Sequence, residues 1–518
     1  MNLPSTEDVA EPSGAPILSV LGIAGHVYAT EALSRRFGVP VDLILGWGSG
    51  SDYLRDIDPK VVGRVYSLAD FVAEHQSGCE AASDDDVINE SREIEQRIGL
   101  AAVNPHHYFD RNLRRITNWR AAIRRHLIHL RFVEEVLVDK RYLFIRGENV
   151  TQIGCMIQQV ARGLGHRYLR PLNARIAGRL EMEGDVPGEL LGWETAFRSI
   201  RDGRAGGMED RIEEATEWLD GFRRLPERPK YTITYARNRS NPLKRGWTYV
   251  KLGAGRVSRG LRNRRQHGKF DRESKSTRLP GLNFIEHVLW PDVRALIQGR
   301  RRLFKGKFNG HGDYVYFPLH YSPEISTLVY GYRHEEQLNL IRAIAAYLPT
   351  GYRLVVKEHT AMLGRRPYSF YKALDRLYNV EIVSPSVSTF DLTMSARAVA
   401  TITGTAGFEA YAMGSRVIAC GEVFYRQFPG VLGLEIDADM GSRLAEFLAQ
   451  PPPDDETIRA CFNAYFVCTH RSTMVDVGED TDKSSAVAEA DNFAIACEQS
   501  LLALEETDQH GAVAGQEA

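Results

Sequence analysis

The sequence predicts an α/β protein with two Rossmann-like domains that face a central cleft. Three observations carry this prediction. Apolar runs of strand length alternate with helical segments. Small, glycine-containing turns follow several of these runs. The chain has 518 residues, which exceeds the usual size of one domain. We expect a disordered start (1–15), an N-terminal α/β domain (16–222), a basic linker or insertion (223–305), a C-terminal α/β domain (306–470), and a helix with a disordered tail (471–518).

In the N-terminal half, strand-like and helix-like segments alternate, which is typical of a parallel sheet covered by helices. Residues 83–86 read Ser-Asp-Asp-Asp, and we interpret them as the start of a helix, because a serine cap and early acidic residues both favour that end. The expected strands are residues 16–23, 41–45, 64–68 and 142–146, and the expected helices contain residues 29–37, 112–138 and 150–164.

A second α/β unit begins near Lys307 and has the same alternation. Its length and pattern predict a second sheet, with ligands expected at the carboxyl edge of the strands. The expected strands are residues 314–319, 353–357, 380–383, 398–403 and 416–420, and the expected helices are residues 335–347, 367–377, 455–467 and 484–504.

The overall composition is that of an ordinary globular protein, with 43% apolar and 25% charged residues and a net charge of −2. The six cysteines form no C-x-x-C pair, so we expect neither a zinc site nor an oxidising compartment. The first residues lack the features of a signal peptide, and no uncharged apolar stretch is long enough to span a bilayer. We expect a cytoplasmic protein.

Residues 223–278 differ from the rest, because they hold eighteen lysines and arginines against three acidic residues. Aromatic residues such as Trp247 lie among these cations. The segment could bind an anionic membrane surface or polysaccharide, it could be a solvated linker, or it could stack nucleic-acid bases. We rank the three in that order and predict no nucleic-acid partner; the protein could thus be peripheral on the inner membrane.

Residues 401–409 read TITGTAGFE, an apolar run followed by a glycine-containing turn and a helix-like segment. Glycines let a backbone approach a phosphate, and unpaired amides at a helix start attract anions. We therefore expect Thr403, Gly404, Thr405 and Gly407 to bind a phosphate, and Glu409, one turn on, to bind ribose hydroxyls. The alternative is an ordinary strand-to-helix turn.

Lys357, Glu358 and His359 end the expected strand over 353–357. By the strand period of two, Lys357 and His359 share a face and could contact a nucleotide phosphate or a leaving group. The alternative is a surface lysine and a capping histidine. We favour the ligand, because ligands bind at the carboxyl edge of open α/β sheets.

Three further residues are candidates for the chemistry of the reaction. His320 and Glu324 follow the first strand of the second domain and could shape a sugar pocket or act as acid and base; an incidental polar loop is equally compatible. Glu148 ends a strand of the first domain and could deprotonate an acceptor hydroxyl, although a lone glutamate is more often structural. The D-x-D patterns at 56–58 and 437–439 follow no clear strand, so we predict no metal ion.

The segments PLHYSPE (318–324), VVKEH (355–359) and GTAGFE (404–409) occur in an order that resembles the bacterial capsule (surface) polysaccharide biosynthesis proteins. That family has "PLH..PE", "VKEHP" and "GTAGWEA" segments. The resemblance covers roughly residues 310–425 and is only general before them. Thr360 stands where the family has proline, and Phe408 where it has tryptophan.

The resemblance implies a glycosyltransferase of the two-domain GT-B type, and some relatives use CMP-activated acidic sugars such as Kdo. It implies that His359, Thr403, Gly404 and Thr405 bind the donor phosphate and that Glu409 binds the ribose. By the same resemblance, His320 and Glu324 line the donor sugar.

The expected function is the transfer of a sugar from a nucleotide donor, bound by the second domain, to a surface glycan or glycolipid, with no cofactor. A nucleotide-sugar epimerase or a glycerophosphate-type transferase of the same fold is an alternative. A non-catalytic scaffold that binds glycan or membrane through residues 223–278 is another.

Overall fold

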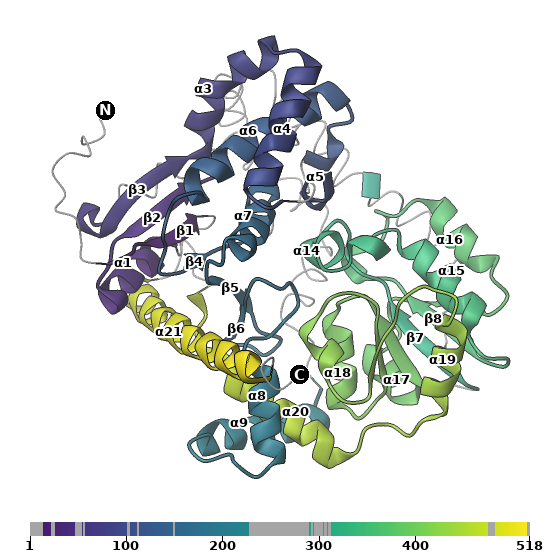
Figure 1. Cartoon of the computed structure of the whole chain (residues 1–518). Coiled ribbons are helices and arrows are strands. Elements are labelled where there is room, and N and C mark those ends of the chain that lie inside the picture. Colours follow the sequence, from purple (N-terminus) through teal and green to yellow (C-terminus); the bar gives the residue numbers. More distant parts are fainter. Residues whose placement is uncertain are drawn as a thin grey trace.

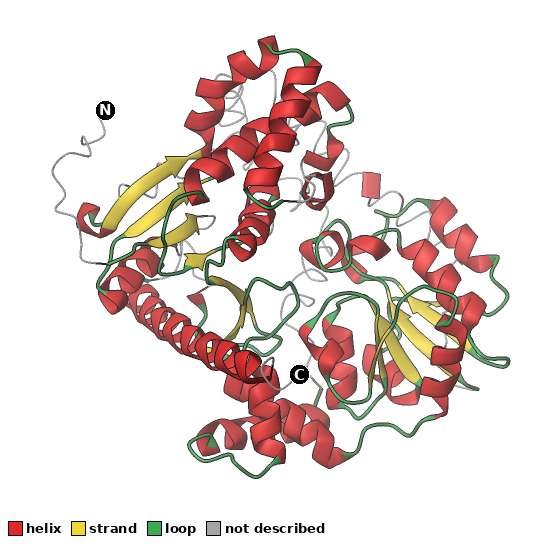
Figure 2. Ribbon diagram, viewed as in Figure 1, coloured by secondary structure: helices red, strands yellow, loops and turns green. Residues whose placement is uncertain are grey.

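The computed structural model describes residues 14–21, 26–46, 54, 57–100, 104–110, 113–148, 151–226, 290–291, 294, 304, 308, 312–474 and 482–514. These residues form two α/β domains that lie beside each other (Figure 1). Each domain has a sheet with helices packed around it (Figure 2). The expected fold class, two Rossmann-like domains, is confirmed. Residues 22–25, most of the basic segment 223–305 and most of residues 1–15 lie outside the described residues.

The N-terminal domain is built on a seven-stranded sheet with the order β13-β6-β5-β4-β1-β2-β3. Strands β1 to β5 are parallel, whereas β6 and β13 are antiparallel additions at one edge. The strands are β1 (Ile17–Leu21), β2 (Val41–Leu45), β3 (Val62–Ser67), β4 (Ile145–Arg146), β5 (Tyr168–Asn173), β6 (Arg179–Glu183) and β13 (His470–Arg471).

The helices of this domain bury apolar side chains against the sheet. They are α1 (His26–Phe37), α3 (Leu68–Ala81), α4 (Asp84–Arg97), α5 (Asn104–Phe109), α6 (Trp119–Leu137) and α7 (Gln152–Gly163), with 3-10 turns at η1 (Pro59–Val61) and η2 (Leu113–Arg115). The run at 83–86 starts α4 as expected. Ser83 Oγ accepts the amide of Asp86 at 3.1 Å, and Asp84 pairs with Arg120 and Arg124.

The C-terminal sheet has six parallel strands in the order β12-β11-β10-β7-β8-β9. The first strand, β7, lies between β8 and β10, so the strand order reverses there. Such a switch point opens a crevice at the carboxyl ends of the two central strands. The strands are β7 (Tyr314–Pro318), β8 (Arg353–Lys357), β9 (Val380–Val383), β10 (Ala398–Thr401), β11 (Val417–Ala419) and β12 (Val431–Gly433).

Helices on both sides of this sheet close its core, in which β7, β8 and β10 are almost wholly buried. They are α14 (Ile325–Leu328), α15 (Gln337–Tyr347), α16 (Tyr368–Asp375), α17 (Thr389–Ser395), α18 (Thr405–Ala412) and α19 (Met440–Ala449), with 3-10 turns at η6 (Tyr332–His334), η7 (Thr360–Met362) and η8 (Phe424–Gln427).

The chain crosses between the domains in both directions. Helices α8 (Trp193–Arg201) and α9 (Glu209–Arg224) follow the N-terminal sheet and pack on α20 (Asp455–Cys468), which follows the C-terminal sheet. After α20 the chain returns, because β13 pairs with β6 and the long helix α21 (Lys483–Ala514) packs along α1 (Figure 1). Residues from both ends of the sequence therefore complete the N-terminal core. No helix among the described residues combines the length and the hydropathy that crossing a bilayer requires.

Truncation of Phe493 tests this return of the chain. Phe493 of α21 is buried in one cluster with Ile17, Leu33 and Leu43 of the N-terminal domain. We expect Phe493→Ala to lower the free energy of unfolding by about 3–5 kcal/mol, through lost burial and a cavity. In hydrogen exchange, protection should fall in α1 and β1 and stay unchanged in β7 to β9. Equal loss in both sheets would contradict this account.

Candidate functional site

The crevice between β7 and β10 collects most of the residues that the sequence singled out. His320 follows β7, the segment 357–359 closes β8, and the turn 403–407 follows β10. The carboxyl ends of parallel strands meet at one edge of the sheet, so these residues lie along a single rim.

His320 is buried and ties the ends of β7 and β10 together. Its Nε2 accepts the backbone N–H of Ile402 at 3.1 Å and lies 2.9 Å from the hydroxyl oxygen of Thr401. Burial lowers the pKa of His320 to about 3, and the charges of His359, Arg366 and Arg175 add to this effect. The lone pair of the neutral ring is thus used inside the protein. His320 therefore positions the end of β10 beside the end of β7.

Glu358 points inward and forms a buried ion pair. Its Oε2 lies 3.0 Å from Nε of Arg366 and accepts the hydroxyl of Tyr371 at 2.6 Å. Its Oε1 accepts the backbone N–H of His359 at 2.7 Å. Burial raises the pKa of Glu358, and Arg366 opposes that shift. Arg366 also donates to the carbonyl oxygen of His320, so this pair fixes the ends of β7 and β8 together. Sequence reasoning did not find Arg366, because no motif marks it. Tyr371 belongs to the family resemblance, but its contact with Glu358 was not expected.

Lys357 is buried as well. Its Nζ donates to the carbonyl oxygen of Val387 at 2.6 Å and to the hydroxyl of Thr389 at 2.7 Å. These contacts hold the loop between β9 and α17 against the end of β8. The ammonium group of Lys357 therefore binds this loop. The sequence had suggested a contact with a phosphate instead.

His359 is the member of this segment that keeps a group available. It is half-buried and caps η7, with Nδ1 accepting the amide of Ala361 at 3.2 Å. Burial lowers its pKa, as do the charges of Arg366 and Lys357. In the neutral ring, Nδ1 acts as the acceptor, so Nε2 carries the proton. This Nε2–H has no acceptor in the part of the chain that the structure describes.

The turn between β10 and α18 presents free backbone amides. Gly404 donates its own N–H to the hydroxyl oxygen of Thr401 at 3.1 Å, and its carbonyl accepts the hydroxyl of Tyr425 at 2.6 Å. The amides of Thr405 and Ala406 have no partner among the described residues. Two unpaired N–H groups at the start of a helix favour an anion.

Thr403 and Gly407 shape this turn. The buried hydroxyl of Thr403 donates to the carbonyl of Ser326 at 2.9 Å, so it anchors the turn to α14. Gly407 leaves no room for a side chain, since an added Cβ would lie 2.7 Å from the hydroxyl of Tyr425 and 2.8 Å from Thr401 Cγ2.

Glu409 lies one turn after Thr405 on α18. Its half-buried carboxylate has no hydrogen bond or ion pair with a described residue. Burial raises its pKa to about 7, and only the charge of Arg175 opposes the shift. A carboxylate with this pKa and no partner is typical of a ligand site.

Arg175 brings a charge from the other domain to this turn. It lies between β5 and β6, and its Nη2 donates to the carbonyl of Thr403 at 3.4 Å. Its backbone N–H bonds Glu181 Oε1 at 3.2 Å and the hydroxyl of Tyr465 at 2.9 Å. Sequence reasoning missed Arg175, because its importance depends on a contact between the domains.

A buried acid on the neighbouring strand also joins the two domains. Glu183 of β6 accepts the hydroxyl of Tyr330 at 2.9 Å and lies 3.1 Å from Arg170. Burial raises its pKa to about 7. Because Tyr330 belongs to the C-terminal domain, this contact holds β6 beside the crevice.

The remaining candidates are more peripheral. Glu324 is exposed at the start of α14, where it accepts the hydroxyl of Ser326 at 3.3 Å. Glu148 follows β4 in the N-terminal domain, and its carboxylate accepts the hydroxyl of Thr151 beside the start of α7. Its neighbour Asn149 lies outside the described residues.

The D-x-D segments have structural roles where the structure describes them. Asp58 caps η1 by accepting the amide of Lys60 at 3.0 Å, and Asp437 pairs with Arg443. Asp56 lies outside the described residues. No group of three or more His, Cys, Asp or Glu side chains within the described ranges is placed to hold a metal ion.

Gly407→Ala, compared with Gly78→Ala, tests how tightly the turn is packed. The first adds a methyl group against Tyr425 and Thr401 and should destabilise the protein by about 1–3 kcal/mol. The second lies inside helix α3 with no atom within 4 Å of the new methyl, and should stabilise by roughly 0.5–1 kcal/mol. Denaturant unfolding measures both, and equal effects would contradict the close contact at 407.

Glu409→Gln should change stability with pH in a defined direction. The folded pKa of about 7 exceeds the ordinary 4.5, so the wild-type protein loses stability as pH rises from 4.5 through 7. The amide variant lacks this loss. At about pH 8 we expect the variant to be more stable by on the order of 1–3 kcal/mol, and at pH 4.5 nearly equal. Thermal unfolding of both proteins between pH 4.5 and 8 measures this difference. A variant that is less stable than the wild type at pH 8 would contradict the expected cost of burying the ionised carboxylate.

Comparison with known proteins locates a family relationship in the C-terminal half. Residues 322–469 match the family model described as capsule polysaccharide biosynthesis protein. This range contains the segment 357–359, the turn 403–407 and Glu409. No curated protein sequence matches the chain.

Solved structures with related folds were also found, and three of them are 10–14% identical to this chain. The beta Kdo 2,7 transferase of Thermosulfurimonas dismutans KpsC is 10% identical, with a TM-score of 0.33, over 70% of this chain and 89% of that chain. The beta Kdo 2,4 transferase of the same protein is 14% identical, with a TM-score of 0.29, over 67% and 86%. Anabaena Alr3699/HepE in complex with UDP-glucose is 10% identical, with a TM-score of 0.25, over 95% and 100%. Over residues 322–469, the chain is similar to the capsule polysaccharide biosynthesis protein family.

Proposed function

We propose that this protein is a glycosyltransferase of surface polysaccharide assembly, which uses a nucleotide-activated sugar as donor. One observation carries the proposal: the first two amides of α18 and the carboxylate of Glu409, one turn on, have no partner among the described residues. The family match over the same residues supports it.

The amides of Thr405 and Ala406 suit the donor phosphate, because they add the positive end of a helix to two hydrogen-bond donors. The Nε2–H of His359 supplies a further donor along the same rim. Arg175 approaches the turn from the opposite domain and contributes a positive charge. Together these groups stabilise the negative charge that collects on a departing nucleotide.

Glu409 suits the ribose of the donor. Ionised, its two oxygens can accept hydrogen bonds from two neighbouring hydroxyls. With a pKa of about 7, the carboxylate is about half ionised at neutral pH before any ligand binds. Hydrogen bonds to its charged form lower the pKa, so a bound ribose favours the accepting state.

The acceptor, a glycan or glycolipid, would enter from the N-terminal domain. We propose Glu148 as the group that deprotonates the acceptor hydroxyl, and Glu324 beside His320 as part of the donor-sugar wall. A CMP-activated acidic sugar such as Kdo is the donor that the family resemblance favours. The protein would work in the cytoplasm, with residues 223–278 at the inner membrane. The membrane contact of this segment is predicted from its composition alone.

His359→Ala tests the phosphate contact. A hydrogen bond to a charged group contributes about 1.5–3 kcal/mol, so calorimetry should show binding of CMP or UDP weakened by roughly tenfold or more. His75→Ala is the matched control, since His75 lies on α3 of the N-terminal domain. Its nucleotide affinity should equal that of the wild type.

Two results would overturn the proposal. One is that the wild-type protein binds neither nucleotide. The other is that His359→Ala and Glu409→Ala, both folded by circular dichroism, retain full sugar transfer to a glycan acceptor.

A further inference from the structure

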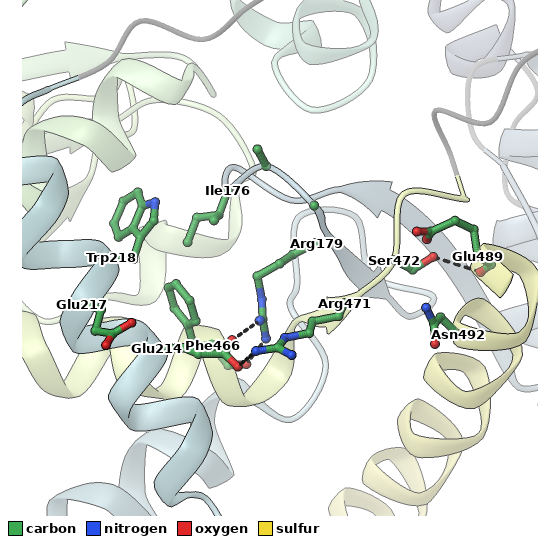
Figure 3. Close-up of a pocket in the computed structure, with 12 residues that line it drawn as sticks. Ile176, Arg179, Glu214, Glu217, Trp218, Phe466, Arg471, Ser472, Glu489 and Asn492 are labelled. Atoms are coloured by element: carbon green, nitrogen blue, oxygen red, sulfur yellow. Dashed lines mark hydrogen bonds and ion pairs between the residues drawn. The ribbon is translucent and has the colours of Figure 1, made fainter. Parts of the chain in front are cut away.

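A cavity of about 550 Å³ lies at the junction of the two domains, and it contains none of the residues of the candidate site (Figure 3). Its volume is within the range of small-molecule pockets, roughly 300–1,000 Å³. The turn between β5 and β6, helix α9, the end of α20, β13 and helix α21 all contribute to its wall.

Helical spacing explains which side chains reach the cavity. Glu214, Glu217 and Trp218 are three and four residues apart on α9, so they share one face. Glu489 and Asn492 are three apart on α21 and form the opposite wall (Figure 3). The cavity therefore depends on the return of the chain after α20.

Two arginines form the floor of the cavity. Arg179 and Arg471 are direct partners in the β6–β13 pair, and both bind Glu214 (Figure 3). Arg179 also donates to the hydroxyl of Thr469 at 2.8 Å and to the carbonyl of Phe466 at 2.7 Å. This floor is rigid, because Arg179 is buried and each of its three guanidinium nitrogens donates a hydrogen bond.

Other polar groups around the cavity are unused. Glu217 and Asn492 are exposed, and neither has a hydrogen bond or ion pair with a described residue. The indole N–H of half-buried Trp218 has no acceptor in the described ranges. A carboxylate, an amide and an indole beside the apolar side chain of Ile176 suit a ligand that is rich in hydroxyls yet has C–H faces.

The charge of the lining argues against an anionic ligand. The two arginines face three glutamates, Glu214, Glu217 and Glu489. Since Glu214 already binds both arginines, no unpaired cation remains among the lining residues to attract a phosphate or a carboxylate.

We propose that this cavity binds an uncharged segment of a glycan, at a distance from the crevice where the nucleotide would bind. That the glycan is the acceptor chain rests on the proposed function. The cavity and the crevice share the β5–β6 turn, where Arg175 contacts Thr403 and Ile176 faces the cavity. They also share a ring contact of 6.0 Å between Trp218 and Phe408, the neighbour of Glu409.

The test measures binding of cellotetraose and chitotetraose to the full chain by saturation-transfer NMR and calorimetry, with tetragalacturonate as the anionic comparison. We expect at least one neutral probe to bind, and the acidic one to bind about tenfold more weakly. The double variant Glu217→Ala/Asn492→Ala should weaken the neutral probe by about tenfold. The controls Glu213→Ala, exposed on α9 outside the cavity lining, and His359→Ala should leave it unchanged.

The proposal is overturned if neither neutral probe binds at millimolar concentration, or if the double variant keeps full affinity. It is also overturned if His359→Ala removes probe binding, which would place the glycan in the crevice. CMP and UDP binding by the same samples separates the two ideas. Nucleotide binding without probe binding removes only the cavity site; probe binding without nucleotide binding removes the proposed function and its acceptor assignment.

Discussion

The crevice of the C-terminal domain depends on one buried, neutral imidazole. The Nε2 of His320 accepts the backbone N–H of Ile402. A protonated ring would place its own N–H against the N–H of Ile402, and it would place a positive charge near Arg366. Burial keeps its pKa near 3, so the arrangement persists throughout the physiological pH range. The contact fixes the end of β10, and the end of β10 sets where the first amides of α18 point. The amides that we propose to bind the donor phosphate are thus oriented by a contact inside the protein.

The segment Lys357-Glu358-His359 shows how a motif divides between structure and binding. The sequence suggested that Lys357 and His359 share a face, by the period of a strand. The strand ends at Lys357, however, and His359 already caps η7, so that period no longer applies. Lys357 and Glu358 stabilise the surrounding loops from inside, whereas the Nε2–H of His359 has no acceptor among the described residues. A motif can therefore mark a site while most of its members hold the scaffold.

The sequence predicted both sheets, because their apolar strands alternate with helices, and it placed the turn after β10 by its glycines. It did not predict β5 and β6. β5 contains Pro171, and the polar residues of β6 resemble an exposed segment. All three charged residues of β6 are nevertheless buried, since each finds a partner far along the chain: Arg179 with Glu214, Glu181 with Tyr465, and Glu183 with Tyr330. The pairs with Tyr465 and Tyr330 require the two domains to be packed together, and periodicity within one segment cannot reveal them.

The same domain packing links Arg175 to the chemistry of Glu409. The guanidinium opposes the raised pKa of Glu409, and Tyr465 and Glu181 both accept the backbone N–H of Arg175 near the turn. Movement of Arg175 away from the turn would raise that pKa further, and Glu409 would take up a proton and become a hydrogen-bond donor. Its approach favours the ionised form, which accepts two hydroxyls. In the proposed function, the contact of Arg175 with the turn therefore favours the form of Glu409 that accepts hydrogen bonds from ribose hydroxyls.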